Sequence, residues 1–439
     1  MINNRIIRKL VFFLPKRIMF WLIKNNFTFI MALFYKVFII KEKKSKHKSP
    51  IGNSDKITIL ALSVNKFRGD TECLSQVNNF RILTIDNNMW QTMLVYYFMK
   101  KKIFPAVFMN AEDDSDIGRC RNKINVFFDG FISALLKLIR IDCVITVSNK
   151  YLEDLPWVMH FEKEGIPHIC LYREGFLSFD RAYDGVTARN SRFKGYPVTH
   201  LIVQNQVLRK SFVEAGFVTE GQVSVCGALR MDDLLKQVNA GKGGPISKYE
   251  KRRKRVILFY ISYKKSLFGK EKLAEFEKIH GSKYSYAEVI WPHRFDLFRD
   301  LHISIIRLAQ KLPDVDFVIK PKRSYMNKKN VSWDEYLGIV NEMGVDFSKL
   351  KNYTIEPDAN AHDLILNSDV VIALQSSTVL EAAIAGKPVI FPLFYNYKET
   401  KNFNDFSYRN HIDLFDVAES AEELEALIIK TLENPKIDN

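Results

Sequence analysis

The stretch that decides the fold is SDVVIALQSSTVLEAAIAGKPVIFP, residues 368–392. Val370 to Leu374 is a short apolar run rich in β-branched residues, which predicts a buried parallel strand. A helical pattern follows from Leu380 to Ala385, and Gly386 followed by proline is typical of a helix end. Val389 to Phe391 then predicts a second buried strand. Together these patterns indicate one βαβ unit of a parallel sheet.

The turn inside this unit, Gln375-Ser376-Ser377-Thr378, lies at the carboxyl end of a strand and opens a helix. Free backbone N–H groups, the positive end of a helix dipole and three hydroxyls are a set that suits a phosphate or a ribose. The same residue types also cap helices without binding any ligand. The residues alone leave both interpretations open.

The stretch resembles the nucleotide-binding segment of the C-terminal domain of GT-B glycosyltransferases. The resemblance is strongest to bacterial capsule, lipopolysaccharide and polyol-phosphate transferases with the pattern D-x-x-[IL]-x-x-x-S-S-x-x-x-E-A. The matching residues are Asp369, Ser376, Ser377, Glu381 and Ala382. UDP-N-acetylglucosamine 2-epimerases share a related segment. The resemblance implies an α/β chain of two Rossmann-like, doubly wound domains with a cleft between them, the second of which binds a nucleotide donor through Ser376, Ser377, Thr378 and Glu381.

Composition supports a folded two-domain chain. The 439 residues are enough for two domains, and 47% hydrophobic with 26% charged residues is a globular composition. The five cysteines form no C-x-x-C pair, which argues against a zinc site or a disulfide framework and fits a reducing cytoplasm. The resemblance likewise implies no metal ion, and no cofactor other than the nucleotide-sugar substrate.

Positive charge is concentrated at the amino end. Of the net charge of +15, residues 1–50 contribute twelve Lys or Arg against the single acid Glu42. These cations are interleaved with apolar runs, a composition typical of a membrane surface segment and not of a nucleic-acid-binding face.

The apolar runs of this segment are short. Phe27 to Ile40 contains Lys36 and falls below the roughly 20 apolar residues of a spanning helix. We therefore predict a peripheral, monotopic anchor of one or two amphipathic helices on the cytoplasmic face of the inner (plasma) membrane. A short transmembrane helix, or helices packed on the protein's own core, are the alternatives.

Beyond this segment, apolar runs alternate with helical patterns such as Ile124 to Ile139, which indicates βαβ units. We predict an anchor at 1–50, a first domain at 51–240 that binds the acceptor, a basic linker at 241–255 and a second, donor-binding domain at 256–439. The predicted strands are Ile57 to Val64, Arg81 to Asp86, Ala106 to Met109, Cys143 to Val147, His168 to Tyr172, Leu201 to Val203, Val223 to Cys226, Val256 to Ile261, Val315 to Lys320, Val370 to Leu374 and Val389 to Phe391.

Polar residues that follow strands of the second domain are further donor-site candidates, because open α/β sheets bind ligands at strand carboxyl ends. Ser262 and Lys264 follow the first of these strands, where a solvated turn is the alternative. Lys320, Lys322 and Arg323 follow the second. Related transferases carry a histidine where Lys322 stands, so the resemblance implies that these cations face the donor phosphates without a general acid.

In the first domain, Arg173-Glu174-Gly175 ends an apolar strand. It resembles the [DE]-[DE]-G motif of bacterial sialyltransferases, whose second acid is a general base on the acceptor hydroxyl. Glu174 matches that acid, and a structural ion pair is its alternative role. His293 is a second catalytic candidate. The D-x-D triplet at 114–116 lies in a polar stretch that predicts a solvated loop.

No P-loop, zincin or hydrolase motif occurs in the chain. The function expected from the resemblance is transfer of a sugar from a nucleotide donor to a lipid-linked or growing surface glycan, with other polysaccharide-assembly enzymes as possible partners. A polyol phosphotransferase with a CDP-linked donor and an inactive membrane scaffold of the same fold are the alternatives.

Overall fold

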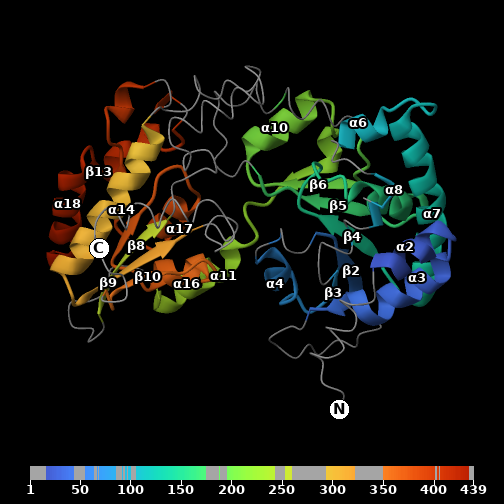
Figure 1. The fold of residues 1–439 in the computed structure, drawn as a ribbon, viewed down its shortest axis with the longest axis horizontal. Helices are drawn as coiled ribbons and strands as arrows, with labels where there is room; N and C mark the ends of the chain where they lie inside the picture. The colour runs from blue at the N-terminus through green and yellow to red at the C-terminus, as the bar shows by residue number, and fades with distance from the viewer. Residues whose placement is uncertain are drawn as a thin grey trace, which may run out of the picture. The chain divides into compact units, whose positions relative to one another are not determined.

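The computed structural model describes residues 16–43, 55–63, 67, 69–85, 91, 94–95, 97–99, 105–174, 187, 195–242, 253–259, 293–321, 350–400, 403–404 and 406–434. The chain divides into two compact units, Met1–Asp232 and Asp233–Asn439. The division falls inside helix α11 (Met231–Gln237), eight residues before the predicted boundary at 240. Each unit is built on its own sheet (Figure 1).

The second unit contains a six-stranded sheet in the order β10-β9-β8-β11-β12-β13, with every neighbouring pair parallel. In chain order this is 3-2-1-4-5-6, the doubly wound arrangement whose direction reverses between its first and fourth strands. The reversal lies here between β8 and β11. The strands are β8 (Lys254–Phe259), β9 (Val315–Lys320), β10 (Tyr353–Ile355), β11 (Val370–Ile372), β12 (Val389–Pro392) and β13 (Asp416–Ala418).

Helices cover both faces of this sheet. The helices α14 (Arg294–Lys311) and α18 (Ala421–Glu433) pack together on one face, while α16 (Ala361–Leu366) and α17 (Thr378–Ile384) pack together on the other (Figure 1). The strands between them are therefore buried on both sides, which explains their continuous apolar runs. At the centre, Val371 of β11 pairs with Ile257 of β8 and Val389 of β12.

The first unit contains a seven-stranded sheet in the order β1-β3-β2-β4-β5-β6-β7. All pairs are parallel except β1 with β3, and the winding reverses between β2 and β4. The strands are β1 (Ile40–Glu42), β2 (Ile57–Ala61), β3 (Phe80–Ile85), β4 (Cys143–Thr146), β5 (His168–Leu171), β6 (His200–Val203) and β7 (Val223–Val225).

Alternate strand residues of this sheet face two cores. Leu60, Leu83 and Val144 join a large cluster with the helices α3, α7 and α8, whereas Ile59, Ile82 and Cys143 join a smaller one with Phe67. The helices are α2 (Lys16–Lys24), α3 (Thr28–Phe34), α4 (Asp70–Leu74), α6 (Pro105–Met109), α7 (Asp116–Leu138), α8 (Leu155–Lys163) and α10 (Gln206–Glu214), with the short helices η1 (Tyr35–Ile39) and η5 (Glu220–Gln222). The short helices η6 (Val238–Lys242), η9 (Tyr397–Glu399) and η11 (Arg409–Leu414) belong to the second unit.

The predicted α/β class and two doubly wound units are confirmed, and most strands fall within two residues of prediction. One predicted strand is wrong, because residues 106–109 lie in helix α6. An apolar run of that length fits either element, and Pro105 favours the first turn of a helix. Of the acidic stretch predicted as a solvated loop, Asp113 and Asp114 are exposed loop residues, whereas Asp116 is the exposed first residue of α7. Ser115 caps α7 by accepting from the Gly118 N–H at 3.0 Å.

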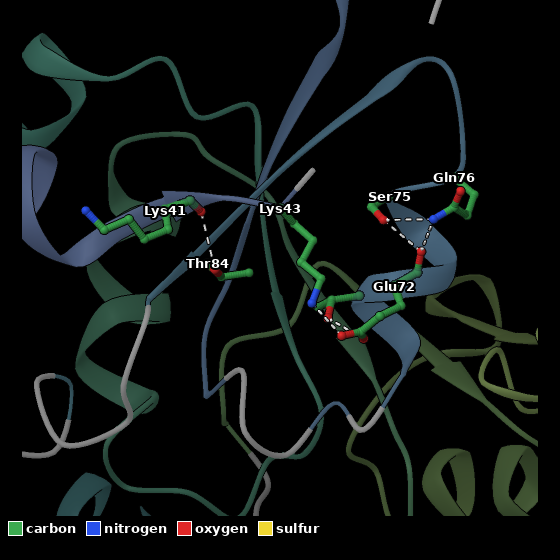
Figure 2. A network of polar contacts seen from close by, with 7 residues as sticks. Lys41, Lys43, Glu72, Ser75, Gln76 and Thr84 are labelled. Carbon is green, nitrogen blue, oxygen red and sulfur yellow. Dashed lines mark hydrogen bonds and ion pairs between the residues drawn. The ribbon is translucent and has the colours of Figure 1, made fainter. Parts of the chain in front are cut away.

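The described part of the predicted anchor is integrated in the first unit. Strand β1 extends the sheet, and Figure 2 shows Lys43 reaching Glu72 of α4, with 2.5 Å between Nζ and Oε1. In the same network the Thr84 hydroxyl of β3 donates to the Lys41 carbonyl at 3.3 Å (Figure 2). Within the described ranges, no helix combines the length and apolarity needed to cross a membrane.

A buried histidine, His168, leads us to expect that the first unit loses stability in acid. His168 of β5 is fully buried, with Nδ1 2.8 Å from the Pro197 carbonyl oxygen and Nε2 2.9 Å from the Thr146 hydroxyl. Burial lowers its pKa to about 4, whereas an unfolded chain keeps a histidine pKa of about 6.5. Between these values the unfolded state binds the proton and the folded state does not, so stability falls as the pH decreases.

We expect His168 to contribute about 3 kcal/mol to the loss in the free energy of unfolding between pH 7 and pH 4, at about 1.4 kcal/mol per pH unit. Urea unfolding at several pH values measures it. His168→Gln should flatten the pH dependence, while substitution of the exposed His411 to Gln serves as the control. An identical slope in His168→Gln would contradict the assignment. The buried His302 of α14, whose pKa burial also lowers to about 4, adds its own dependence in the second unit.

Candidate functional site

The turn between β11 and α17 lies where the winding of the second sheet reverses. Ser376 bends the chain back by a backbone hydrogen bond from its N–H to the Leu374 carbonyl at 3.0 Å. Its hydroxyl oxygen accepts from the Thr378 hydroxyl at 2.8 Å and from the Thr378 N–H at 3.3 Å. Both serines and Thr378 are only partly buried. The turn therefore presents hydroxyls at the edge where doubly wound sheets bind ligands.

Ser377 precedes α17 but its side chain does not cap the helix. Its hydroxyl instead donates to the Glu381 carboxylate at 3.3 Å, one turn further on. Glu381 is buried, and its other oxygen lies 3.6 Å from Nε2 of His362 at the start of α16. Glu381 thus joins α17 to α16 and holds the Ser377 side chain in place. The alternative that the two serines and Thr378 only cap the helix is wrong for Ser377, whose side chain forms no capping hydrogen bond.

A second segment supports the turn from outside. The Tyr408 hydroxyl donates to the Ser376 carbonyl at 2.7 Å, and the Gln375 side chain donates to the Ser407 hydroxyl at 2.8 Å. Burial raises the pKa of Tyr408, and the nearby Glu381 carboxylate raises it further. Tyr408 therefore stays protonated and can act as the donor that fixes the turn.

Lys320 ends β9, two strands away from the turn on the same edge. Its ammonium donates to the carbonyls of Pro321 at 3.1 Å and Pro357 at 2.9 Å. These contacts hold a positive charge at the carboxyl edge of the sheet. The other predicted cations and hydroxyl of this edge, Lys264, Lys322, Arg323 and Ser262, lie outside the described residues.

His293 lies at the amino end of α14. In a parallel β-α-β connection this end of the helix is also at the carboxyl edge. Its ring stacks on Tyr395, with centroids 4.9 Å apart and planes 15° apart, and Nδ1 lies 3.0 Å from the Asp296 carboxylate. The Tyr395 hydroxyl donates to Asp300. His293 is thus held in the second unit, on the same edge as the serine turn.

In the first unit, Glu174 follows β5 at the carboxyl edge of its sheet. The carboxylate forms an ion pair with Lys150, which follows β4. Lys150 also lies over the Tyr172 ring, 5.5 Å from its centroid. Since the Glu174 side chain is 46% exposed, a hydroxyl group from solvent can reach it. Lys150 was not predicted, although its position after a strand was a usable signal.

Arg173 contacts a different partner, as alternation along an extended chain predicts. Its Nε lies 3.0 Å from the Asp70 carboxylate of α4, and both side chains are largely buried. The two atoms are not aligned as a hydrogen bond, so the attraction is mainly electrostatic. Burial raises the pKa of Asp70, although Arg173 and Arg230 oppose the shift. Arg173 is therefore neutralised away from Glu174.

The buried Asn149 lies beside this network, between Ser148 and Lys150. Neither polar atom of its side chain has a hydrogen-bond partner in the part of the chain that the structure describes. As for metals, no group of three or more His, Cys, Asp or Glu side chains among the described residues could hold an ion. That the reaction needs no metal stays a prediction.

Comparison with known proteins gives no family assignment. No protein-family model matches the chain, and neither does any curated protein. Similar solved structures include a UDP-GlcNAc 2-epimerase from Neisseria meningitidis bound to UDP-GlcNAc (13% identity, 86% of this chain and 91% of that chain, TM-score 0.42). Another is an Anabaena protein in complex with UDP and glucose (13% identity, 86% of this chain and 90% of that chain, TM-score 0.41). A third is a UDP-forming trehalose-phosphate synthase from Burkholderia xenovorans (11% identity, 87% of this chain and 92% of that chain, TM-score 0.38).

These TM-scores are too low to carry an argument. The two doubly wound α/β units therefore rest on the chain's own strand order and register.

Proposed function

We propose that the chain is a nucleotide-sugar-dependent glycosyltransferase of the GT-B type. The observation that carries the proposal is the position of Ser376 and Ser377. They lie at the winding reversal of a 3-2-1-4-5-6 sheet, in a sequence pattern that resembles the donor-binding segment of such enzymes. In this proposal Ser376, Ser377 and Lys320 contact the donor phosphates. Glu381 holds Ser377 and accepts a hydrogen bond from the ribose.

In this proposal the acceptor binds to the first unit. Glu174, at the carboxyl edge of that unit's sheet, acts as the general base on the acceptor hydroxyl. The acceptor is a lipid-linked or growing surface glycan of the capsule or lipopolysaccharide kind. The enzyme works at the cytoplasmic face of the plasma membrane, beside other enzymes of polysaccharide assembly. Neither a metal ion nor a cofactor takes part.

Nucleotide affinity tests the donor site. We expect Ser377→Ala and Lys320→Ala each to weaken binding of the nucleotide about 10- to 150-fold, because a hydrogen bond to a charged group is worth about 1.5–3 kcal/mol. Isothermal titration calorimetry with UDP, CMP and CDP measures these affinities and also shows which nucleotide the protein prefers. Matched controls are Ser115→Ala, which removes a helix-capping hydroxyl in the first unit, and Lys398→Ala, which removes an exposed lysine paired with Glu419.

Unchanged affinity in both site variants, with folded proteins by circular dichroism, would remove the donor assignment. Wild-type protein that binds none of the three nucleotides would instead favour an inactive scaffold. Binding of CDP with transfer of a polyol phosphate in product analysis would establish the phosphotransferase alternative.

A further inference from the structure

The N-terminal helices of the first unit are apolar on two opposite faces. Met31, Ala32, Tyr35 and Ile39 are fully buried against the unit's core. The opposite side of α3 and η1 exposes apolar side chains at helical spacing, and Trp21 of α2 joins them through ring contact with Phe27, centroids 5.1 Å apart. We call this exposed set the N-terminal apolar face; it consists of Trp21 (55% exposed), Phe27 (39%), Phe29 (54%), Ile30 (50%), Leu33 (44%), Val37 (50%) and Phe38 (38%).

The buried side of α3 is held against the core by a close contact with α7. Gly130 of α7 lies against Thr28 at the start of α3, where an added Cβ would come within 3.0 Å of the threonine hydroxyl oxygen. Because α3 approaches α7 this closely, its outer residues cannot rotate into the core. Seven large apolar side chains on three successive short elements are more than the isolated exposed residues normal for a soluble surface. Such a face needs a partner.

Exposed cations flank this face, and the first acid after them in the chain, Glu42, is paired with Arg81. Lys24 and Lys36 lie on α2 and η1, and residues 16–41 contain no Asp or Glu. The Lys41 ammonium lies 3.4 Å from the Val37 carbonyl oxygen, at the margin of the face. Figure 2 shows the Lys41 side chain extending away from the Lys43–Glu72 pair. The partner surface should therefore be apolar inside and negatively charged at its edge.

From these observations we infer that the N-terminal apolar face is a monotopic docking surface for an anionic lipid monolayer. Aromatic and aliphatic side chains enter the boundary between headgroups and acyl chains, and Lys24, Lys36 and Lys41 contact the anionic headgroups. Because β1 is hydrogen-bonded to β3 and tied to α4, the docked element is a rigid part of the first unit and not a tether.

A second copy of the chain fits this face less well. A two-fold symmetric contact would place each copy's lysines near those of the other, with no acid from the segment to neutralise them. The cores of protein interfaces are also depleted in lysine. The inference concerns a surface distinct from the serine turn and from Glu174, and it holds whichever reaction the chain catalyses.

Vesicle binding by the full-length protein tests the inference. We expect strong co-sedimentation with phosphatidylcholine vesicles that contain phosphatidylglycerol, and weaker binding to phosphatidylcholine alone. The triple variant Phe29→Ser, Ile30→Ser, Leu33→Ser should lose at least about tenfold in binding to both. Lys24→Gln, Lys36→Gln, Lys41→Gln should lose up to about 100-fold on anionic vesicles at low salt, at about fivefold per cation, and little on neutral ones.

Matched controls are Val77→Ser and Leu414→Ser, which alter exposed apolar residues elsewhere and should bind vesicles like the wild type. Thermal unfolding and nucleotide titration of every variant test whether the fold and the donor site are intact. Failure of the membrane-docking inference can therefore be distinguished from failure of the proposed function. Wild-type vesicle binding in the apolar triple variant would overturn the inference. The inference would also be overturned if the wild-type protein did not bind vesicles but was a dimer that the same substitutions convert to a monomer. In that case a second copy of the chain would cover the N-terminal apolar face.

Discussion

Replacing Glu174 by glutamine is expected to lower turnover about 10²–10⁴-fold and to leave nucleotide affinity unchanged. Glutamine keeps the size of the side chain but cannot accept the acceptor's proton. The carboxylate lies at the carboxyl edge of the first sheet, is partly exposed and is held in place by Lys150. The donor turn belongs to the other unit, so the substitution should not change donor binding.

Two further variants separate catalysis from structure. Glu164→Gln, at the exposed end of α8, is the matched control and should keep wild-type turnover. Lys150→Met removes the ion pair but keeps the carboxylate, so it should lower turnover less than Glu174→Gln does. If Glu174→Gln reacts at the wild-type rate, the pair with Lys150 is structural and His293 becomes the catalytic candidate. Thermal unfolding of each variant excludes loss of fold as the cause.

The central strands were predictable because burial on both faces demands continuous apolar, β-branched runs. Val315 to Lys320 is predicted with both ends correct, and the ends of β8, β11 and β12 differ from prediction by two residues or fewer. The missed strands β1, β10 and β13 have three residues each and lie at the edges of their sheets. A run of that length has no period to detect, and pairing with a neighbour makes it a strand. Length alone is not decisive, because β7 and β11 are equally short and are predicted.

In the candidate site, too, only the residues that form a local sequence pattern could be predicted. Ser376, Ser377 and Glu381 lie within six residues, so a local pattern was enough to find them. The partners that hold them are distant in sequence. His362 of α16 lies 3.6 Å from Glu381 of α17, and Tyr408 donates to the Ser376 carbonyl from 32 residues further along the chain. Asp70 of α4 and Arg173 come together only because the strands that precede them, β2 and β5, end on the same edge of the sheet. No spacing rule predicts such contacts, which depend on the order of strands in the sheet.

At the amino end, the sequence pattern could not separate two kinds of burial. An apolar residue that faces a protein core and one that lies on the surface look the same in a sequence pattern, and Phe27 to Ile40 contains both kinds. Tyr35 and Ile39 are fully buried, whereas Val37 and Phe38 between them are exposed. The alternative, packing on the protein's own core, is confirmed for the buried side of this segment, and a membrane-facing role of the exposed side stays a prediction.

Replacing Tyr35 by alanine is accordingly expected to destabilise the first unit by about 3–5 kcal/mol, the usual cost of removing a buried aromatic ring. The Tyr35 ring is fully buried, with Phe131 at 5.1 Å and Trp157 at 5.7 Å between ring centroids. Both partners belong to the helices α7 and α8, so the cavity would open in the centre of the larger core. Urea unfolding at neutral pH measures the change in the free energy of unfolding.

Phe38→Ala is the matched control, because its ring is 38% exposed and contacts the Phe34 ring, so it should cost much less stability than Tyr35→Ala, about 1 kcal/mol. The reverse should hold for vesicle binding, where Phe38→Ala weakens the interaction. If Tyr35→Ala unfolds like the wild type, the N-terminal segment does not belong to the core and acts as a detachable anchor. If both predictions hold, one short segment supports the fold with one face and contacts the membrane with the other, and deleting residues 1–50 would unfold the first unit instead of releasing it from the membrane.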